Sequence, residues 1–173
     1  MINAKATIFK KIKLSTFETI GSGPIHLPEE ELHTNALWLS IAPDVVEAVG
    51  EGPFDQALTG LAHLLQHVAP VFVMCDRHDL HVIPQMKAEH SERPTIFIYD
   101  RYPGGIGLAK AVYQNLDTII VQVEELLHSC PCQSGCPACI GLVDGSGQNI
   151  KTLIKRLLNL LKKQRNEEAS WSV

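Results

Sequence analysis

Residues 128–141 read HSCPCQSGCPACIG and hold four of the five cysteines of the chain. They form a C-x-C pair and a C-x-x-C pair, separated by three residues, and the four ligand candidates are Cys130, Cys132, Cys136 and Cys139. Zinc prefers four ligands in a tetrahedron, and a C-x-x-C turn lets two thiolates point at one ion. Proline and glycine between the cysteines let the loop reverse direction tightly. The spacing therefore predicts one closed metal site, with structural zinc as its occupant.

Two alternatives to a zinc site remain open at this stage. Four thiolates can also hold an iron–sulfur cluster, and the cysteines could instead be free or redox-active. The N-terminus has no apolar stretch followed by a cleavage site, so we expect a reducing, cytoplasmic environment, where clustered thiols act as metal ligands. A closed four-thiolate site indicates a structural role rather than a catalytic one.

Composition and charge narrow the classes of protein. The chain has 173 residues, of which 45% are hydrophobic and 20% charged, as in an ordinary globular domain. No apolar run approaches the roughly 18–20 residues that span a bilayer, so we expect no membrane partner. The net charge of −4 means that any contact with DNA must use a local basic patch. Two groups of lysines are candidates, although a solvated charged face is the alternative for both: Lys151, Lys155, Lys162 and Lys163 near the C-terminus, and Lys5, Lys10, Lys11 and Lys13 near the N-terminus.

The pattern of apolar residues predicts a mixed α/β fold, a small mixed sheet with packed helices. Short apolar runs predict strands at Ala36–Ile41, Val71–Cys75, Leu80–Ile83 and Thr95–Tyr99. Helical spacing predicts one helix from Phe54 to Pro70, two helical stretches between 106 and 127 with a break at 115–117, and a last amphipathic helix from Ile150 to Leu161. Turn signals before residue 45 predict strands or hairpins, and Gly145 and Gly147 predict a turn. The metal loop would tie together the two helices that flank it.

A second motif follows the clearest predicted strand. The stretch DRYPGGIG, residues 100–107, places Asp100 at the end of a strand and Gly104, Gly105 and Gly107 at the start of a helix. Backbone N–H groups at such a place can bind phosphate. The pattern matches no known nucleotide-binding loop, and the alternative is structural: the glycines permit close packing while Asp100 accepts hydrogen bonds from the turn.

The order of these motifs resembles a known family. The runs VFVMCDRHDL (71–80), TIFIYDRYPGGIGLAKAV (95–112) and HSCPCQSGCPACIG (128–141) are similar to the zinc-binding C-terminal domain of MrfA-type DEAD/DEAH-box DNA helicases, over about residues 55 to 161. The resemblance implies an accessory zinc domain that packs on an ATP-driven, superfamily-two motor in DNA repair and helps to shape the path of single-stranded DNA. It also implies that Cys130, Cys132, Cys136 and Cys139 are the metal ligands.

One departure from the family limits what these residues can do alone. The chain contains neither a G-K-[ST] loop nor an Asp-Glu-x-His box, so by itself it would not hydrolyse ATP. We therefore expect residues 46–173 to form the helicase-associated zinc-binding domain, with residues 1–45 as a strand or hairpin region of that domain. Its partners would be helicase motor domains in cis and single-stranded DNA. The competing interpretations are a stand-alone zinc-stabilised protein–protein adaptor and an enzyme that binds a phosphorylated ligand at Gly104–Gly107.

Overall fold

A computed structural model describes residues 2–4, 6–16, 18–141 and 149–167, and it has the predicted mixed α/β fold. At its centre lies a three-stranded sheet in the order β5 (Ala36–Ser40), β7 (Thr95–Asp100) and β6 (Leu80–Gln85). Both neighbours pair with β7 in antiparallel fashion. The small sheet was expected to be mixed, but every strand pair among the described residues is antiparallel.

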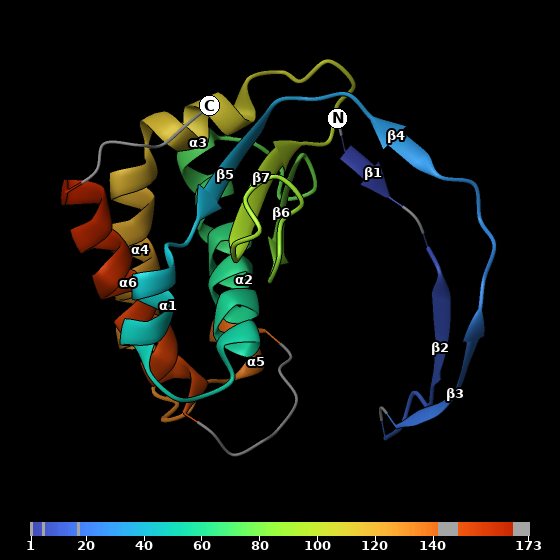
Figure 1. Cartoon of the computed structure of the whole chain (residues 1–173), viewed down its shortest axis with the longest axis horizontal. Coiled ribbons are helices and arrows are strands. Elements are labelled where there is room, and N and C mark those ends of the chain that lie inside the picture. The colour runs from blue at the N-terminus through green and yellow to red at the C-terminus, as the bar shows by residue number, and fades with distance from the viewer. Residues whose placement is uncertain (1, 5, 17, 142–148, 168–173) are drawn as a thin grey trace.

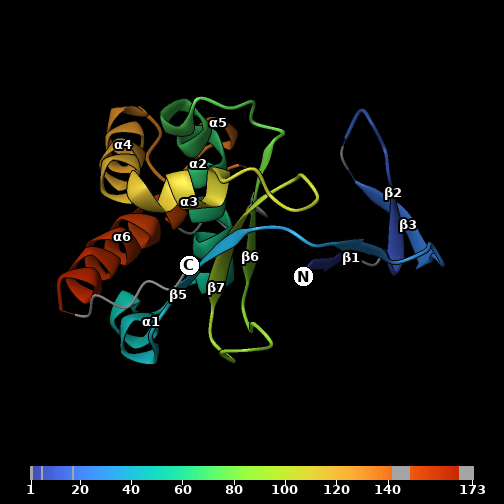
Figure 2. The same cartoon turned by 90° about the horizontal axis from the view of Figure 1, so that it is seen from above.

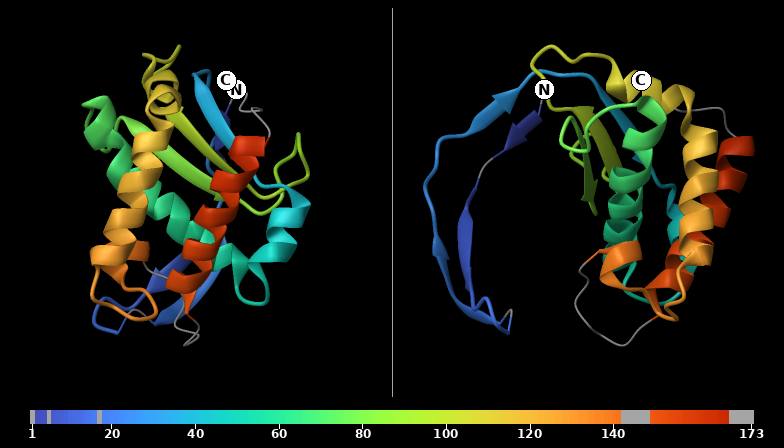
Figure 3. Two further views of the ribbon diagram at one scale, coloured as in Figure 1. Left: turned by 90° about the vertical axis from the view of Figure 1, so that its left-hand side faces the viewer. Right: turned by 180° about the vertical axis from the view of Figure 1, so that it is seen from behind.

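Helices cover one face of this sheet (Figure 1). In chain order they are α1 (Pro43–Val49), α2 (Phe54–Val73), α3 (Leu108–Gln114), α4 (Leu116–Ser129), α5 (Pro137–Ile140) and α6 (Ile150–Glu167). The long helix α2 contacts β6 on one side and α4 and α6 on the other. Figure 3 shows α4 and α6 as an outer helical layer beyond α2. This arrangement places α2 at the centre of the molecule, where ten of its residues are buried.

The alternation of residues along the strands decides which sheet face is buried. Leu37 and Ile98 lie opposite each other in the register, as do Leu39 and Ile96, and all four are almost fully buried against the helices. Successive side chains of a strand point to opposite faces, so the residues between them lie on the other face. That second face is turned away from α2.

One predicted strand is wrong. Residues 71–75 were expected to form a buried strand after a helix ending at Pro70, yet α2 continues through Pro70 to Val73 and closes at Met74 in a left-handed conformation. Val71 is 72% exposed, so the run VFV is not a core strand. A short apolar run cannot be assigned to strand or helix by its periodicity. Here residues 71–73 continue the preceding helix α2 and do not form a strand.

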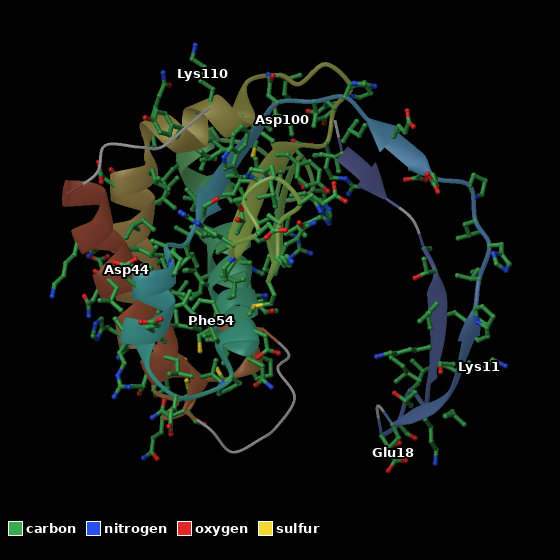
Figure 4. The ribbon with its side chains drawn as sticks, in the orientation of Figure 1. Lys11, Glu18, Asp44, Phe54, Asp100 and Lys110 are labelled. Atoms are coloured by element: carbon green, nitrogen blue, oxygen red, sulfur yellow. The ribbon has the colours of Figure 1, made fainter. Side chains whose placement is uncertain are left out.

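The described residues up to 35 form an arm that projects from the body. Strand β1 (Ile2–Ala4) pairs with β4 (Glu30–Leu32), and β2 (Ile8–Ile12) pairs with β3 (Thr19–Pro24) to form a ribbon. Figure 2 shows this arm on the side of the sheet opposite α2. Figure 4 places Lys11 and Glu18 at its outlying end. The predicted strands and hairpin are therefore present, but they add nothing to the main core.

The remaining predicted elements are present. The strand at 95–100, the strand that begins at Leu80, the helix break at Asn115 and the last helix from Ile150 all lie where the pattern placed them. The turn predicted at Gly145 and Gly147 lies outside the described residues. Among the helices that the structure describes, none has both the length and the apolar character needed to cross a bilayer.

Candidate metal centre

The four clustered cysteines meet where α4, α5 and α6 converge. Cys130 ends α4, and Cys136 directly precedes the short helix α5, which contains Cys139. Their sulfur atoms lie close together: Cys130 to Cys132 3.4 Å, Cys130 to Cys136 3.6 Å, Cys132 to Cys139 3.5 Å and Cys136 to Cys139 3.7 Å. All five cysteines are free thiols. Among the described residues this is the one group of three or more candidate ligands that could hold a metal ion.

These distances agree with the geometry of a zinc ion bound by four thiolates. With Zn–S bonds of about 2.3 Å, the sulfurs at the corners of a regular tetrahedron lie about 3.8 Å apart. The observed separations are 3.4–3.7 Å, and a disulfide would require about 2.05 Å. The cysteines therefore form a donor set into which one tetrahedral ion fits, with every corner of the tetrahedron filled by sulfur.

The thiols differ in how readily they lose a proton. The pKa of Cys136 is lowered to about 7, chiefly because the backbone N–H of Cys139 stabilises its thiolate, with help from the Cys130 thiol. Burial raises the pKa of Cys139 to about 12. A metal ion binds thiolates, so its binding must displace the proton from Cys139 even at neutral pH.

The loop that carries the cysteines is fixed to the core by Ile140. This side chain is buried, and a Cβ atom built on Gly135 would lie 2.1 Å from its Cδ1. Gly135 also has a φ of 120°, a conformation that favours glycine. On the other side Ile140 meets Gly60 of α2, where an added Cβ would approach it to 3.3 Å. The metal loop is thus packed directly on the central helix.

Lys151 lies inside this centre, although the sequence placed it among the exposed candidates for DNA contact. Only 5% of the residue is exposed. Its ammonium group donates to the carbonyl oxygens of Cys130 (2.6 Å) and Cys132 (2.8 Å) and lies 3.7 Å from the sulfur of Cys132. Its spacing from Ile154 and Leu158 on α6, at i+3 and i+7, could have revealed that it belongs to the buried face.

The other lysines of α6 also differ in their surroundings. Lys162 forms an ion pair with Glu124 of α4, and Lys155 lies 3.4 Å from Nδ1 of His128. Lys163 is exposed. The predicted basic face of this helix is therefore divided, because two of its four lysines are engaged by α4 and one by the metal loop.

The DRYPGGIG turn is closed by its own aspartate. Asp100 is fully buried, and its Oδ2 accepts hydrogen bonds from the backbone N–H groups of Ile106, Gly107 and Leu108 at 2.7, 2.8 and 3.0 Å. Its Oδ1 accepts from Ala109 at 2.7 Å. These are the donors that a phosphate would need at the start of α3, and the carboxylate already uses them. The structural interpretation of this motif fits the geometry.

The three glycines of the turn let the chain reach that carboxylate. Gly104, Gly105 and Gly107 have φ values of 81°, 71° and 92°, which other residues rarely adopt. A Cβ on Gly105 would also lie 2.6 Å from the side-chain nitrogen Nδ2 of Asn35 and 2.9 Å from its backbone nitrogen. The turn therefore holds α3 against the end of β7 and beside the short segment that leads into β5.

Comparison with known proteins connects this cysteine centre to helicases. A sequence model of the MrfA zinc-binding domain matches residues 61–140. The ATP-dependent helicase YprA of Bacillus subtilis is 53% identical over 158 residues, which are 91% of this chain and 21% of that protein. A protein of Methanocaldococcus jannaschii is 31% identical over 85 residues, 45% of this chain and 76% of that protein.

A solved structure shows the same fold. The crystal structure of the DUF1998 helicase MrfA bound to DNA matches with a TM-score of 0.69 and 52% identity, and the match covers 94% of this chain and 21% of that one. The chain thus spans about a fifth of the length of these helicases.

Proposed function

Because the chain belongs to the MrfA zinc-binding domain family, we propose that it is the accessory zinc domain of an ATP-dependent DNA helicase that acts in DNA repair. It stabilises the motor and guides single-stranded DNA, while ATP is hydrolysed by motor domains in cis. The single observation that carries this proposal is the four-sulfur cluster, which lies within a fold shared with MrfA over 94% of the chain.

We propose that Cys130, Cys132, Cys136 and Cys139 hold one structural zinc ion. The sulfur separations and the name of the matched family support zinc over an iron–sulfur cluster. A closed set of four thiolates leaves no open position for a substrate. The ion would fix the end of α4 to the start of α6 and hold both against α2.

A local excess of lysines supports a role in DNA binding for the β2–β3 ribbon of the arm. Residues 1–24 hold four lysines and one glutamate, a net charge of +3, whereas Glu29, Glu30 and Glu31 near the base of the arm bring residues 1–35 as a whole to a net charge of zero. Lys10 and Lys11 lie on β2, in the ribbon that projects from the body. Lysines on such an element can neutralise phosphates and release counterions. The ribbon is therefore the strongest candidate for contact with the DNA backbone.

The apolar side chains of the same arm support docking on another protein surface. Ile8 is 66% exposed and Leu14 is 89% exposed, and Ile20 on the partner strand is also exposed. An isolated two-stranded ribbon is marginally stable in water, so contact with a further surface would stabilise it. In a chain that matches a fifth of its helicase relatives, the motor domains would supply that surface.

A chimera tests the proposal directly. This chain would replace the matching segment of the B. subtilis helicase YprA, with which it shares 53% identity. We expect the chimera to keep ATP-dependent unwinding, and the same chimera with Cys136→Ser to lose most of it together with its zinc. YprA without the segment is the control for the need for the domain. A zinc-free Cys136→Ser chimera that unwinds DNA as fast as the parent would contradict the proposal.

Three further points accompany the proposal. We propose that residues 1–45 and 46–173 form one domain, which the pairing of β5 with β7 supports. A cytoplasmic location is proposed because free clustered thiols need a reducing compartment. The exposed apolar arm would equally suit a stand-alone protein–protein adaptor. Retention of a protein partner by this chain, without affinity for single strands, would favour that alternative.

A further inference from the structure

The face of the central sheet turned away from α2 presents aromatic rings. Antiparallel pairing places Trp38, Phe97 and Ile83 in one row across β5, β7 and β6, and Ala36, Tyr99 and His81 in the next row. These residues alternate with the buried residues of the helix-covered face, so they share the open face. Phe97 and Trp38 are each half-buried. The open face thus carries Phe97 and Tyr99 at successive positions of its central strand, and of the two rings Phe97 is the more accessible because Tyr99 is only 8% exposed.

A histidine extends this aromatic surface. His90, from the loop between β6 and β7, lies edge-on to two rings, 5.6 Å from Trp38 and 5.8 Å from Phe97 between ring centroids. His81 lies 5.6 Å from Tyr99 and is tilted by 35° relative to it. Beside these rings is a hollow of about 390 Å³, lined in part by Phe97, Tyr99 and His90. Phe97, Tyr99 and His90 therefore border one open space, whose wall also includes the acidic side chain of Glu89.

Polar groups able to form hydrogen bonds surround the rings. Gln85 and His90 are exposed, His81 is half-buried, and none of these three side chains has a hydrogen-bond partner among the described residues. Burial, with the nearby charge of Arg101, lowers the pKa of His81, so its ring is neutral at pH 7 and can both donate and accept. The exposed Arg101 directly follows β7 and adds a positive charge at the end of the face.

From these features we infer that the open face of the β5–β7–β6 sheet, centred on Phe97 and Trp38, is a platform on which bases of single-stranded nucleic acid stack. Aromatic rings in a sheet with free hydrogen-bonding groups beside them match what an unpaired base needs, a flat apolar face and a polar edge. Arg101 would meet the phosphate chain. This inference rests on the proposed role in guiding DNA and assigns the contact with bases to one surface.

The position of the arm is consistent with this assignment. The open face is turned toward the arm (Figure 2), and Ile2 of β1 forms part of the wall of the hollow. In Figure 2 the ribbon that carries Lys10 and Lys11 lies on the side of the body toward which the aromatic face is turned. A strand between them could stack its bases on the sheet while its phosphates meet the lysines.

The experiment measures binding of a labelled oligodeoxythymidylate of about 12 nucleotides to the whole chain by fluorescence anisotropy. The variants are Phe97→Leu and Trp38→Leu, which keep apolar bulk but remove the ring. We expect each to bind between about fivefold and about 150-fold more weakly, with an unchanged dependence on salt, because stacking neutralises no phosphate. Val71→Ala, at an exposed position of α2, is the matched control and should bind like the parent chain.

Fluorescence supplies a readout that a purely structural role would not change. In a Trp171→Phe background, Trp38 is the remaining tryptophan, and stacking of bases beside it should quench its emission with the same midpoint as the anisotropy curve. If the parent chain binds but both ring variants bind equally well, the platform is wrong while the role in guiding DNA stands. If the parent chain does not bind at all, that proposed role fails as well. Ring variants that lose binding to a motor protein instead would show that the face is a protein interface.

Discussion

Replacing Lys151 with methionine should weaken the metal centre without removing a ligand. Methionine matches the length of lysine but carries no charge, so the change removes the ammonium group that lies 3.7 Å from the sulfur of Cys132. Zinc with four thiolates has a net charge of −2, or about half a charge per sulfur. Half a charge at this distance, at an effective dielectric constant of about 20, corresponds to ~2.2 kcal/mol, or roughly a 40-fold change in zinc affinity.

Loss of the two hydrogen bonds from Lys151 to the carbonyls of Cys130 and Cys132 acts in the same direction. Groups that orient metal ligands typically change affinity by about 10-fold to 100-fold, which brackets this figure. The assay is titration of the zinc-loaded protein with a chelator of known affinity. Lys163→Met is the matched control, because Lys163 lies exposed on the same helix. An affinity of Lys151→Met within twofold of the parent chain would refute the reasoning.

Other predictions address the remaining parts of the account. Cys136→Ser should release zinc and lower the melting temperature by about 5–15 °C, as seen by circular dichroism; unchanged melting with full zinc content would contradict this. Zinc affinity should fall as the pH falls, because zinc must displace the proton of Cys139. The slope of the logarithm of zinc affinity against pH should steepen by about one below pH 7, where Cys136 is also protonated and a further proton must be displaced. A slope that stays constant from about pH 9 to pH 6 would contradict these pKa values. Asp100→Asn should cost about 3 kcal/mol or more in urea unfolding, because four backbone donors lose a buried carboxylate; a cost below about 1 kcal/mol would remove its structural role. The double variant Lys10→Gln, Lys11→Gln should bind the oligonucleotide more weakly, and the logarithm of its affinity should depend less steeply on the logarithm of the salt concentration. An unchanged salt dependence would exclude contact between these lysines and phosphates.

The parts of the structure that the sequence predicts well are those with a strong local signal. The cysteine spacing predicts the cluster because metal geometry constrains a short loop. Strand β7 follows from its run of β-branched and aromatic residues, and α6 from its apolar stripe. In each case the physical constraint acts over a few neighbouring residues.

The parts that the sequence did not predict depend on distant contacts. The apolar run after Pro70 reads equally as strand or helix, and only packing of α2 between β6 and the outer helices decides between them. Lys151 resembles a surface lysine until the fold brings the carbonyls of the metal loop to it. The aromatic face is visible only when the register aligns Trp38 with Phe97, which are 59 positions apart in the sequence.

X-ray absorption at the zinc edge of the freshly purified, reduced chain tests the central claim most directly. The account predicts one zinc per chain with four sulfur neighbours at about 2.3 Å, and loss of one sulfur neighbour, or of the metal, in Cys136→Ser. Nitrogen or oxygen neighbours in the parent chain, iron in place of zinc, or no bound metal would contradict it.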